Sequence, residues 1–191
     1  MTRSALFAIV TSRLRAARRP VVYSCAAAAL GGAMQLPYLE GPVLFCSLIG
    51  MLLALLQGPG RYPHLDLCEQ GAPLFGRELA RARAIAPCIA AGLATAAYSI
   101  ASLAHTDLAS AAYAFVAALG AVISCTLVAL CASIRTGAPR WLYLALGCAS
   151  GIVALELAAS LPIAAELGFC ALVAFTALRQ YGEALARYDP V

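Results

Sequence analysis

Long apolar runs, separated by short breaks rich in proline, glycine and charge, are the feature that most constrains the fold of this chain. An α-helix needs about 20 mostly apolar residues to cross the hydrocarbon core of a bilayer. The chain contains six such runs: Pro20–Leu39, Val43–Gly58, Ala86–Ala104, Leu108–Ile134, Trp141–Leu161 and Pro162–Tyr181. The sequence therefore predicts an all-α integral membrane protein with six transmembrane helices.

Composition agrees with this class of protein. Hydrophobic residues make up 63% of the chain and charged residues 12%, whereas a soluble domain is usually about 45–50% apolar and about 25% charged. In a chain of 191 residues, six helices leave no room for an added soluble catalytic domain. The net charge of +4 is too small to indicate nucleic-acid binding.

The positions of the arginines predict how the chain is oriented. All 13 basic residues are arginine. If six helices are threaded with both termini on one side, every arginine falls on that side, and the other side has Glu40, Asp107 and Glu166. The positive-inside rule makes the arginine side cytoplasmic. We therefore expect a multi-pass protein of the bacterial cytoplasmic (inner) membrane with both termini in the cytoplasm.

Residues 1–19 are predicted to form an amphipathic helix that lies in the cytoplasmic interface. Leu6, Ile9, Val10 and Leu14 follow helical spacing, and arginines cluster towards the end of the segment. No long apolar stretch precedes a small-residue cleavage site, so we do not expect a signal peptide. A frayed basic tail is the alternative. Residues 20–181 would then be the transmembrane domain, and residues 182–191 a cytoplasmic tail.

The loop between the second and third runs, residues 59–85, is charged and helix-prone. Leu65–Leu67 begins a short helix that is expected to end before Pro73, a residue suited to the first turn of a new helix. Apolar residues of the second helix share one face at spacings of three and four. The loop is therefore predicted to form a helix, a kink and a second helix against the cytoplasmic face, with the third span beginning at Pro87.

This loop resembles the first cytoplasmic loop of the permease subunits of type-2 ABC exporters. The resemblance is carried by Pro73, Leu74, Arg77, Glu78 and Leu79, together with the loop's place after the second span. The chain departs from the family pattern in lacking the acidic-Gly-Thr start of that loop. The family also carries re-entrant helices between the fifth and sixth spans, where this chain has only a short connection.

The resemblance implies a mechanism. The loop would act as a coupling helix that contacts a separate ABC ATPase, and a second permease subunit, identical or different, would complete the transporter. The residues implied to contact the ATPase are Pro73, Leu74, Arg77, Glu78 and Arg81. ATP and Mg²⁺ would bind to the partner, because no phosphate-binding G-x-x-x-x-G-K-[ST] motif occurs in this chain. The chain itself is therefore not expected to be an enzyme. The alternative is that these charges are solvated anchors.

Glu156 is the one ionisable residue predicted to lie well inside a span. An unpaired charge at the bilayer centre costs about 2.5 kcal/mol or more, so Glu156 is a candidate for the substrate path or for the interface between permeases. A helix-packing hydrogen bond to Ser150, Ser160 or another subunit is the alternative. Glu166 is expected to be a simple interfacial residue near the outer end of the last span.

The sequence thus predicts the permease subunit of an ABC transporter, an exporter of a hydrophobic or amphipathic substrate. The alternative is a non-catalytic scaffold or accessory subunit of a larger membrane complex, which the short connection Ala158–Glu166 favours. An intramembrane enzyme is disfavoured because no catalytic motif is visible. The eight cysteines are expected to be free and to pack as small apolar residues. No cofactor or metal is expected in the chain, and lipid is an expected partner.

Overall fold

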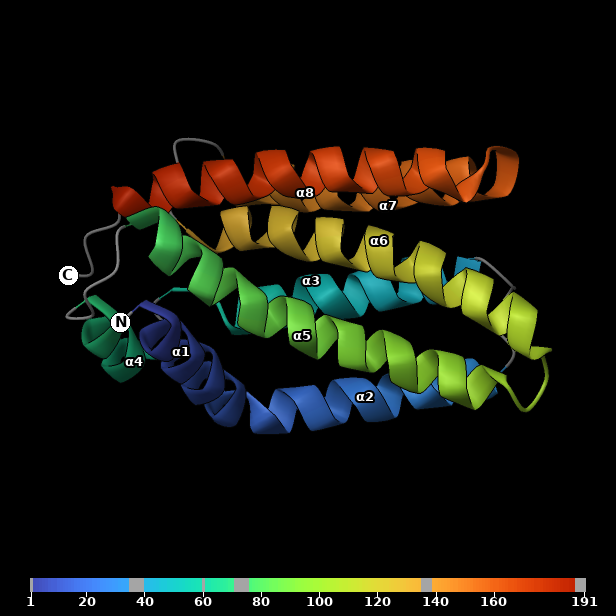
Figure 1. Ribbon diagram of the computed structural model, residues 1–191, viewed down its shortest axis with the longest axis horizontal. Helices are drawn as coiled ribbons and strands as arrows, with labels where there is room; N and C mark the ends of the chain where they lie inside the picture. The colour runs from blue at the N-terminus through green and yellow to red at the C-terminus, as the bar shows by residue number, and fades with distance from the viewer. Residues whose placement is uncertain (1, 35–39, 60, 71–75, 135–138, 188–191) are drawn as a thin grey trace.

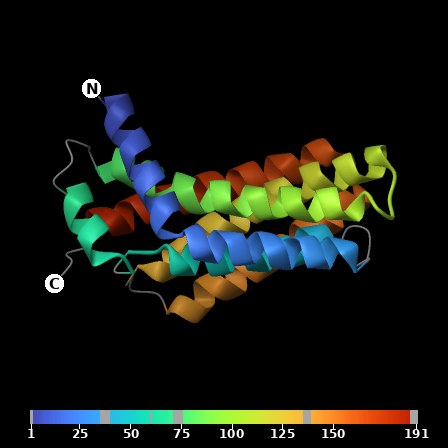
Figure 2. The ribbon, with the colours of Figure 1, turned by 90° about the horizontal axis from the view of Figure 1, so that it is seen from below.

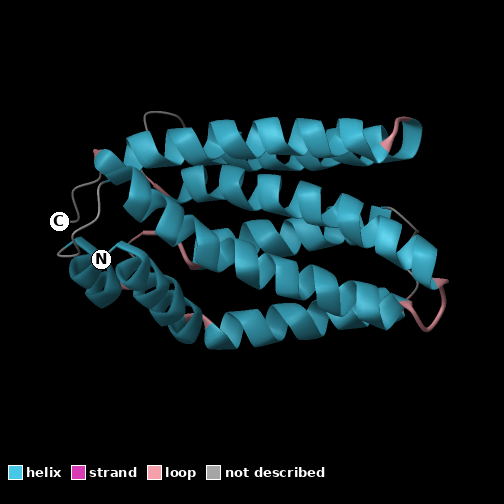
Figure 3. Ribbon diagram, viewed as in Figure 1, coloured by secondary structure: helices cyan, strands magenta, loops and turns pink. Residues whose placement is uncertain are grey.

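The computed structural model describes residues 2–34, 40–59, 61–70, 76–134 and 139–187, and within these ranges every regular element is helical (Figure 3). The elements are α1 (Thr2–Ala16), α2 (Arg18–Ala33), a π-helical turn η1 (Gly41–Phe45), α3 (Cys46–Leu56), α4 (Pro63–Gln70), α5 (Gly76–Ser102), α6 (Leu108–Ser133), α7 (Arg140–Ser160) and α8 (Ile163–Ala186).

Four helices in the described part of the chain are long and apolar enough to cross a membrane: Glu78–Ser102, Leu108–Ser133, Arg140–Ser160 and Ile163–Ala186. They overlap the last four predicted spans, confirm the all-helical class and support a membrane protein. The stretch Gly41–Leu56 is apolar but shorter. At 1.5 Å per residue it rises about 24 Å, less than the roughly 30 Å of the hydrocarbon core.

The long helices run side by side along one axis, with α6 in the middle of the bundle (Figure 1). Helix α6 packs against α3, α5, α7 and α8, and most of its length is buried. Helices α1 and α4 and the last turn of α8 lie at one end of the bundle (Figure 1). The turn between α5 and α6 lies at the opposite end. There Asp107 caps α6 by accepting a hydrogen bond from the Ser110 backbone N–H. Hydrogen bonding to the Ser110 side chain, together with this backbone bond, lowers the pKa of the Asp107 carboxyl.

Small residues set the helix spacing. A Cβ atom placed on Gly32 of α2 would lie 2.3 Å from the backbone oxygen of Tyr98 in α5, so the two backbones approach more closely than any side chain would allow. A Cβ on Gly50 of α3 would lie 2.4 Å from Thr126 Oγ1 of α6. Glycine at these positions lets the helices pack through their backbones, as small residues do in membrane bundles.

Helix α5 is continuous where the sequence predicts a break. It begins at Gly76, inside the charged loop, and runs through Pro87 to Ser102. Proline lacks the N–H that would bond to the carbonyl four residues earlier. The helix persists because its neighbouring alanines, Ala86, Ala90 and Ala91, are each 0% exposed and held by surrounding helices. A separate second loop helix ending before Pro87 is therefore not present.

The two ends of the chain also differ from expectation. Helix α1 turns away from the axis of α2 at Ala17 and projects from the bundle (Figure 2). Its inward face is held by protein, because Ile9 and Val10 are 6% and 8% exposed and α1 packs on α5. Helix α8 runs on to Ala186, so the first residues of the predicted tail, 182–191, belong to the helix.

Candidate functional site

Two arginines and two carboxylates form a buried charge cluster at the end of the bundle where α1, α4 and α5 meet. Arg13 comes from α1, Asp66 and Glu69 from α4, and Arg83 from α5. Their exposed fractions are 1%, 2%, 4% and 2%. Such burial of four ionisable side chains is unusual in any protein, because charges leave water only when they are paired.

Arg13 is the centre of the charge cluster. Its Nε and Nη2 atoms donate to the two oxygens of Glu69 at 2.6 and 2.7 Å. Nη2 also donates to Asp66 Oδ1 at 2.5 Å. Nη1 donates to the backbone oxygen of Gln57, just after α3, at 3.0 Å. One guanidinium therefore joins α1 to α4 and to the end of α3.

Arg83 closes the cluster from α5. Its Nε donates to Glu69 Oε2 at 2.7 Å, and its Nη2 forms an ion pair with Asp66 Oδ1 at 3.3 Å, although Nη2 makes no hydrogen bond in the described residues. Two positive and two negative charges are thus balanced. Burial alone would lower the pKa of Arg13, but the hydrogen bonds and charge of Glu69, together with Asp66, raise it. The arginine stays charged.

Local sequence explains how the cluster forms. Asp66 and Glu69 are three residues apart, so α4 presents both carboxylates on one face. Arg13 follows Ile9 by four residues and Val10 by three, which places it on the buried face of α1. These spacings were the available signals, yet the sequence analysis counted Arg13 only among the arginines clustered at the end of the amphipathic segment and proposed no site at Asp66, Glu69 or Arg83.

Three of the predicted ATPase-contact residues, Arg77, Glu78 and Arg81, lie on α5, the helix that carries Arg83 of this cluster. Pro73 and Leu74 lie outside the described residues. Arg77 and Glu78 lie in the first turn of α5. Glu78 is half-buried and its Oε2 atom has no hydrogen-bond partner in the described residues. Arg81 is exposed, whereas Arg83, two residues later, is buried.

Glu156 and Glu166 each have the opposite exposure to that expected from the sequence. Glu156 is exposed on α7, four residues before the helix ends at Ser160, which is about 6 Å along the axis. The predicted span, which ended at Leu161, placed it at nearly the same depth. Glu166, expected to be interfacial, is 0% exposed. Ser160 Oγ donates to the backbone oxygen of Glu156, and the carboxylate of Glu156 takes no part in that bond.

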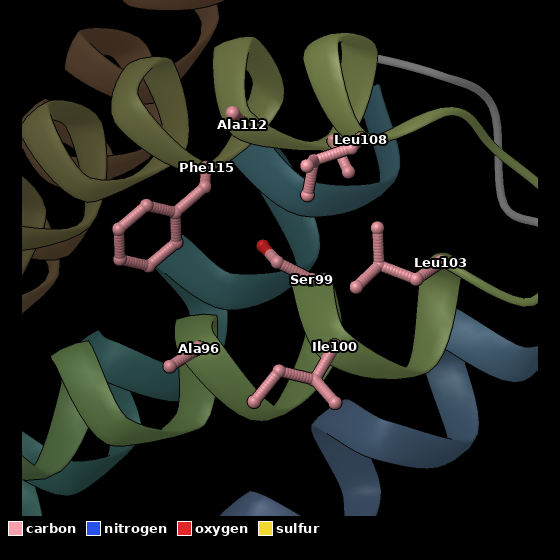
Figure 4. A pocket seen from close by; sticks show the side chains of 8 residues that line it. Ala96, Ser99, Ile100, Leu103, Leu108, Ala112 and Phe115 are labelled. Carbon is pink, nitrogen blue, oxygen red and sulfur yellow. The ribbon is translucent and has the colours of Figure 1, made fainter.

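Two cavities lie along the bundle. One, of about 340 Å³, is lined by α6, α7 and α8. Every lining residue is uncharged: Val128, Cys131, Tyr143, Leu146, Ala149, Ser150, Val153, Phe169, Val173, Thr176, Ala177 and Gln180. The other, of about 220 Å³, lies between the end of α5 and the start of α6. Figure 4 shows Ser99 Oγ pointing into it among apolar side chains such as Ile100 and Phe115.

All eight cysteines are free thiols. The described residues contain no group of three or more His, Cys, Asp or Glu side chains that could hold a metal ion.

Comparison of the chain with protein-family models, with curated proteins and with solved structures yields no match.

Proposed function

We propose that this chain is the permease subunit of an ABC transporter, an exporter that moves a hydrophobic or amphipathic substrate using ATP hydrolysed by a separate subunit. The observation that carries the proposal is the buried charge cluster, which ties the helix α4 of the first large loop to α1 and α5. Since α5 continues from that loop into its membrane span without a break, a force applied to the loop is passed directly to a transmembrane helix.

The proposal includes six membrane crossings. Helix α2 and the η1–α3 segment run beside the four longer helices (Figure 1) and would supply the first two crossings. Each is short, and local thinning of the bilayer would accommodate them. The arginine-bearing end with α1, α4 and the last turn of α8 would then face the cytoplasm of a bacterial cell.

Contacts with the ATPase are assigned to the loop between α4 and the start of α5. Arg81 is exposed at this end, and with Pro73, Leu74, Arg77 and Glu78 it would form the surface seated on the ATPase. ATP and Mg²⁺ would bind on that partner. The surface of α7 and α8 would face lipid or the second permease subunit, and Glu156 on that surface is the candidate for a polar contact there.

The cavity lined by α6, α7 and α8 supports an uncharged or amphipathic substrate. Half of its lining residues are aliphatic, and Phe169 lies farther from the arginine-bearing end than Tyr143 and Gln180 do. A ligand with an apolar body and a hydrogen-bonding head group fits this order of side chains better than a polyanion.

The test is co-purification from the native host. Wild-type protein in detergent is expected to recover an ATP-binding-cassette subunit, and Arg81→Glu is expected to lose it while keeping the thermal stability of the wild type. Arg187→Glu, another exposed arginine at the same end, is the matched control and should retain the partner.

Recovery of a large complex without any ATPase would contradict the transporter proposal and leave the scaffold function. Equal recovery by wild type and Arg81→Glu would place the contact elsewhere than on the exposed face of α5.

A further inference from the structure

Glu166 is a buried acid that the proposed transport cycle does not use. It lies in the first turn of α8 and is 0% exposed. Its Oε1 accepts a weak hydrogen bond from Cys170 Sγ at 3.3 Å. Its Oε2 is buried and has no hydrogen-bond partner in the described residues. One carboxyl oxygen is therefore left unsatisfied inside the protein.

Helix α6 is shaped to receive this carboxyl group. A Cβ atom on Gly120 would lie 3.2 Å from Glu166 Oε1 and 3.1 Å from Leu167 Cδ2, which is tighter than ordinary contacts. Glycine at this position therefore leaves the room that the carboxyl occupies. Around the carboxyl group lies an apolar cluster of buried residues. It contains Cys170 and alanines of α6 and α7, among them Ala117, Ala121, Ala154 and Ala158.

No positive charge balances Glu166. It takes part in none of the ion pairs among the described residues. Arg179, on the same helix, is 13 residues further along and thus about 20 Å away along the axis. The start of a helix favours a negative charge, but neither oxygen of Glu166 accepts a backbone N–H. An ionised, unpaired carboxylate in such a place costs far more than a neutral one.

We propose that Glu166 is a proton-binding site, in which a proton neutralises the carboxyl group while α6 and α8 are packed together. Loss of the proton would leave a charge that only water or a cation could satisfy, so the two helices would have to separate at Gly120. Binding of the proton to Glu166 is thereby linked to the packing of α6 on α8. This inference stands independently of the ATP-driven transport proposed above.

Infrared spectroscopy of the full chain in lipid vesicles at neutral pH tests the site. Uniform ¹³C labelling of glutamate separates glutamate carboxyl bands from those of aspartate. The wild type is expected to show the C=O stretching band of a protonated glutamic acid, and this band should shift when the vesicles are transferred to D₂O. Glu166→Gln should remove the band. Glu183→Gln, which changes an exposed glutamate at the other end of the same helix, should leave it unchanged.

Gly120→Ala provides a second variant that keeps the carboxyl group. Its added methyl group would press on Oε1, so the band should change frequency rather than disappear. Absence of a protonated glutamate band in the wild type would overturn the proposal, and this measurement requires no substitution to fold. A band that survives Glu166→Gln, or one that does not respond to D₂O, would overturn it as well.

Discussion

Arg13 and Arg83 show how much the position of one side chain depends on what faces it. Both belong to arginine-rich stretches that also contain exposed arginines, Arg15 in one and Arg81 in the other. The difference lies on α4, where Asp66 and Glu69 supply two carboxylates to one point. A buried charge is tolerated because it is met by opposite charges with hydrogen-bonding geometry. The same residue type two positions away, Arg15 or Arg81, remains exposed.

Replacement of Arg13 by alanine is expected to destabilise the protein severely. The change leaves Asp66 and Glu69 with one arginine between them, and breaking a buried ion pair in this way costs about 3–5 kcal/mol. Arg15→Ala on the same helix should stay within about 0.5 kcal/mol, as surface substitutions usually do. Thermal unfolding in detergent measures both, and equal midpoints for the two variants would show that the cluster contributes no stability.

Helix α2 packs on α5 through glycine, so the contact should be sensitive to a single methyl group. Gly32→Ala would place a Cβ 2.3 Å from a backbone oxygen of α5, and backbone cannot rotate away as a side chain does. Overpacking of this kind costs about 1–3 kcal/mol.

Gly168→Ala is the matched control for Gly32→Ala. A Cβ on Gly168 of α8 would meet nothing within 4 Å, so alanine there should be neutral or stabilising by up to about 1 kcal/mol through helix propensity. The two thermal midpoints are therefore expected to move in opposite directions. A Gly32→Ala variant as stable as the wild type would show that α2 is not held against α5 in the membrane.

At the scale of elements, hydropathy predicted where the last four long helices lie, to within a few residues at most ends. The predicted boundary at Pro87 was wrong. A proline usually ends a helix, whereas here buried alanines on both sides of it hold the helix in place, and the helix continues past Pro87. The burial of individual side chains was also hard to predict. Glu156 and Glu166 lie in the same hairpin, and only the packing partner of each, open surface for one and Gly120 for the other, decides which is buried.

The charge cluster could be predicted only in part. The spacing of Asp66 and Glu69 shows that they share a face, but it does not show that the face turns inward. That depends on α1 returning over the loop, a contact between residues 56 positions apart for Arg13 and Glu69. Contact with an ATPase remains a prediction for Pro73, Leu74, Arg77, Glu78 and Arg81.

For the whole molecule, the proposed orientation and the number of crossings can be tested together. In a background without other cysteines, Cys68 on α4 is expected to resist a membrane-impermeant maleimide in intact cells and to react after lysis. Glu40→Cys and His105→Cys, exposed residues at the opposite end, should react in intact cells. Unreactive Glu40→Cys beside reactive His105→Cys would contradict a crossing by α2 and α3, and reactive Cys68 would contradict the orientation.

The charge cluster also has a consequence for how the protein is made. Arg13 leaves the ribosome 53 residues before Asp66 and 56 before Glu69. At about 5–20 residues per second, that is a delay of roughly 3–11 s. During that interval the first helix carries an unmatched arginine and cannot settle against the bundle. The charge cluster therefore closes only after Arg83 of α5 has also been made, and a chain truncated or stalled before Asp66 would expose an unmatched charge.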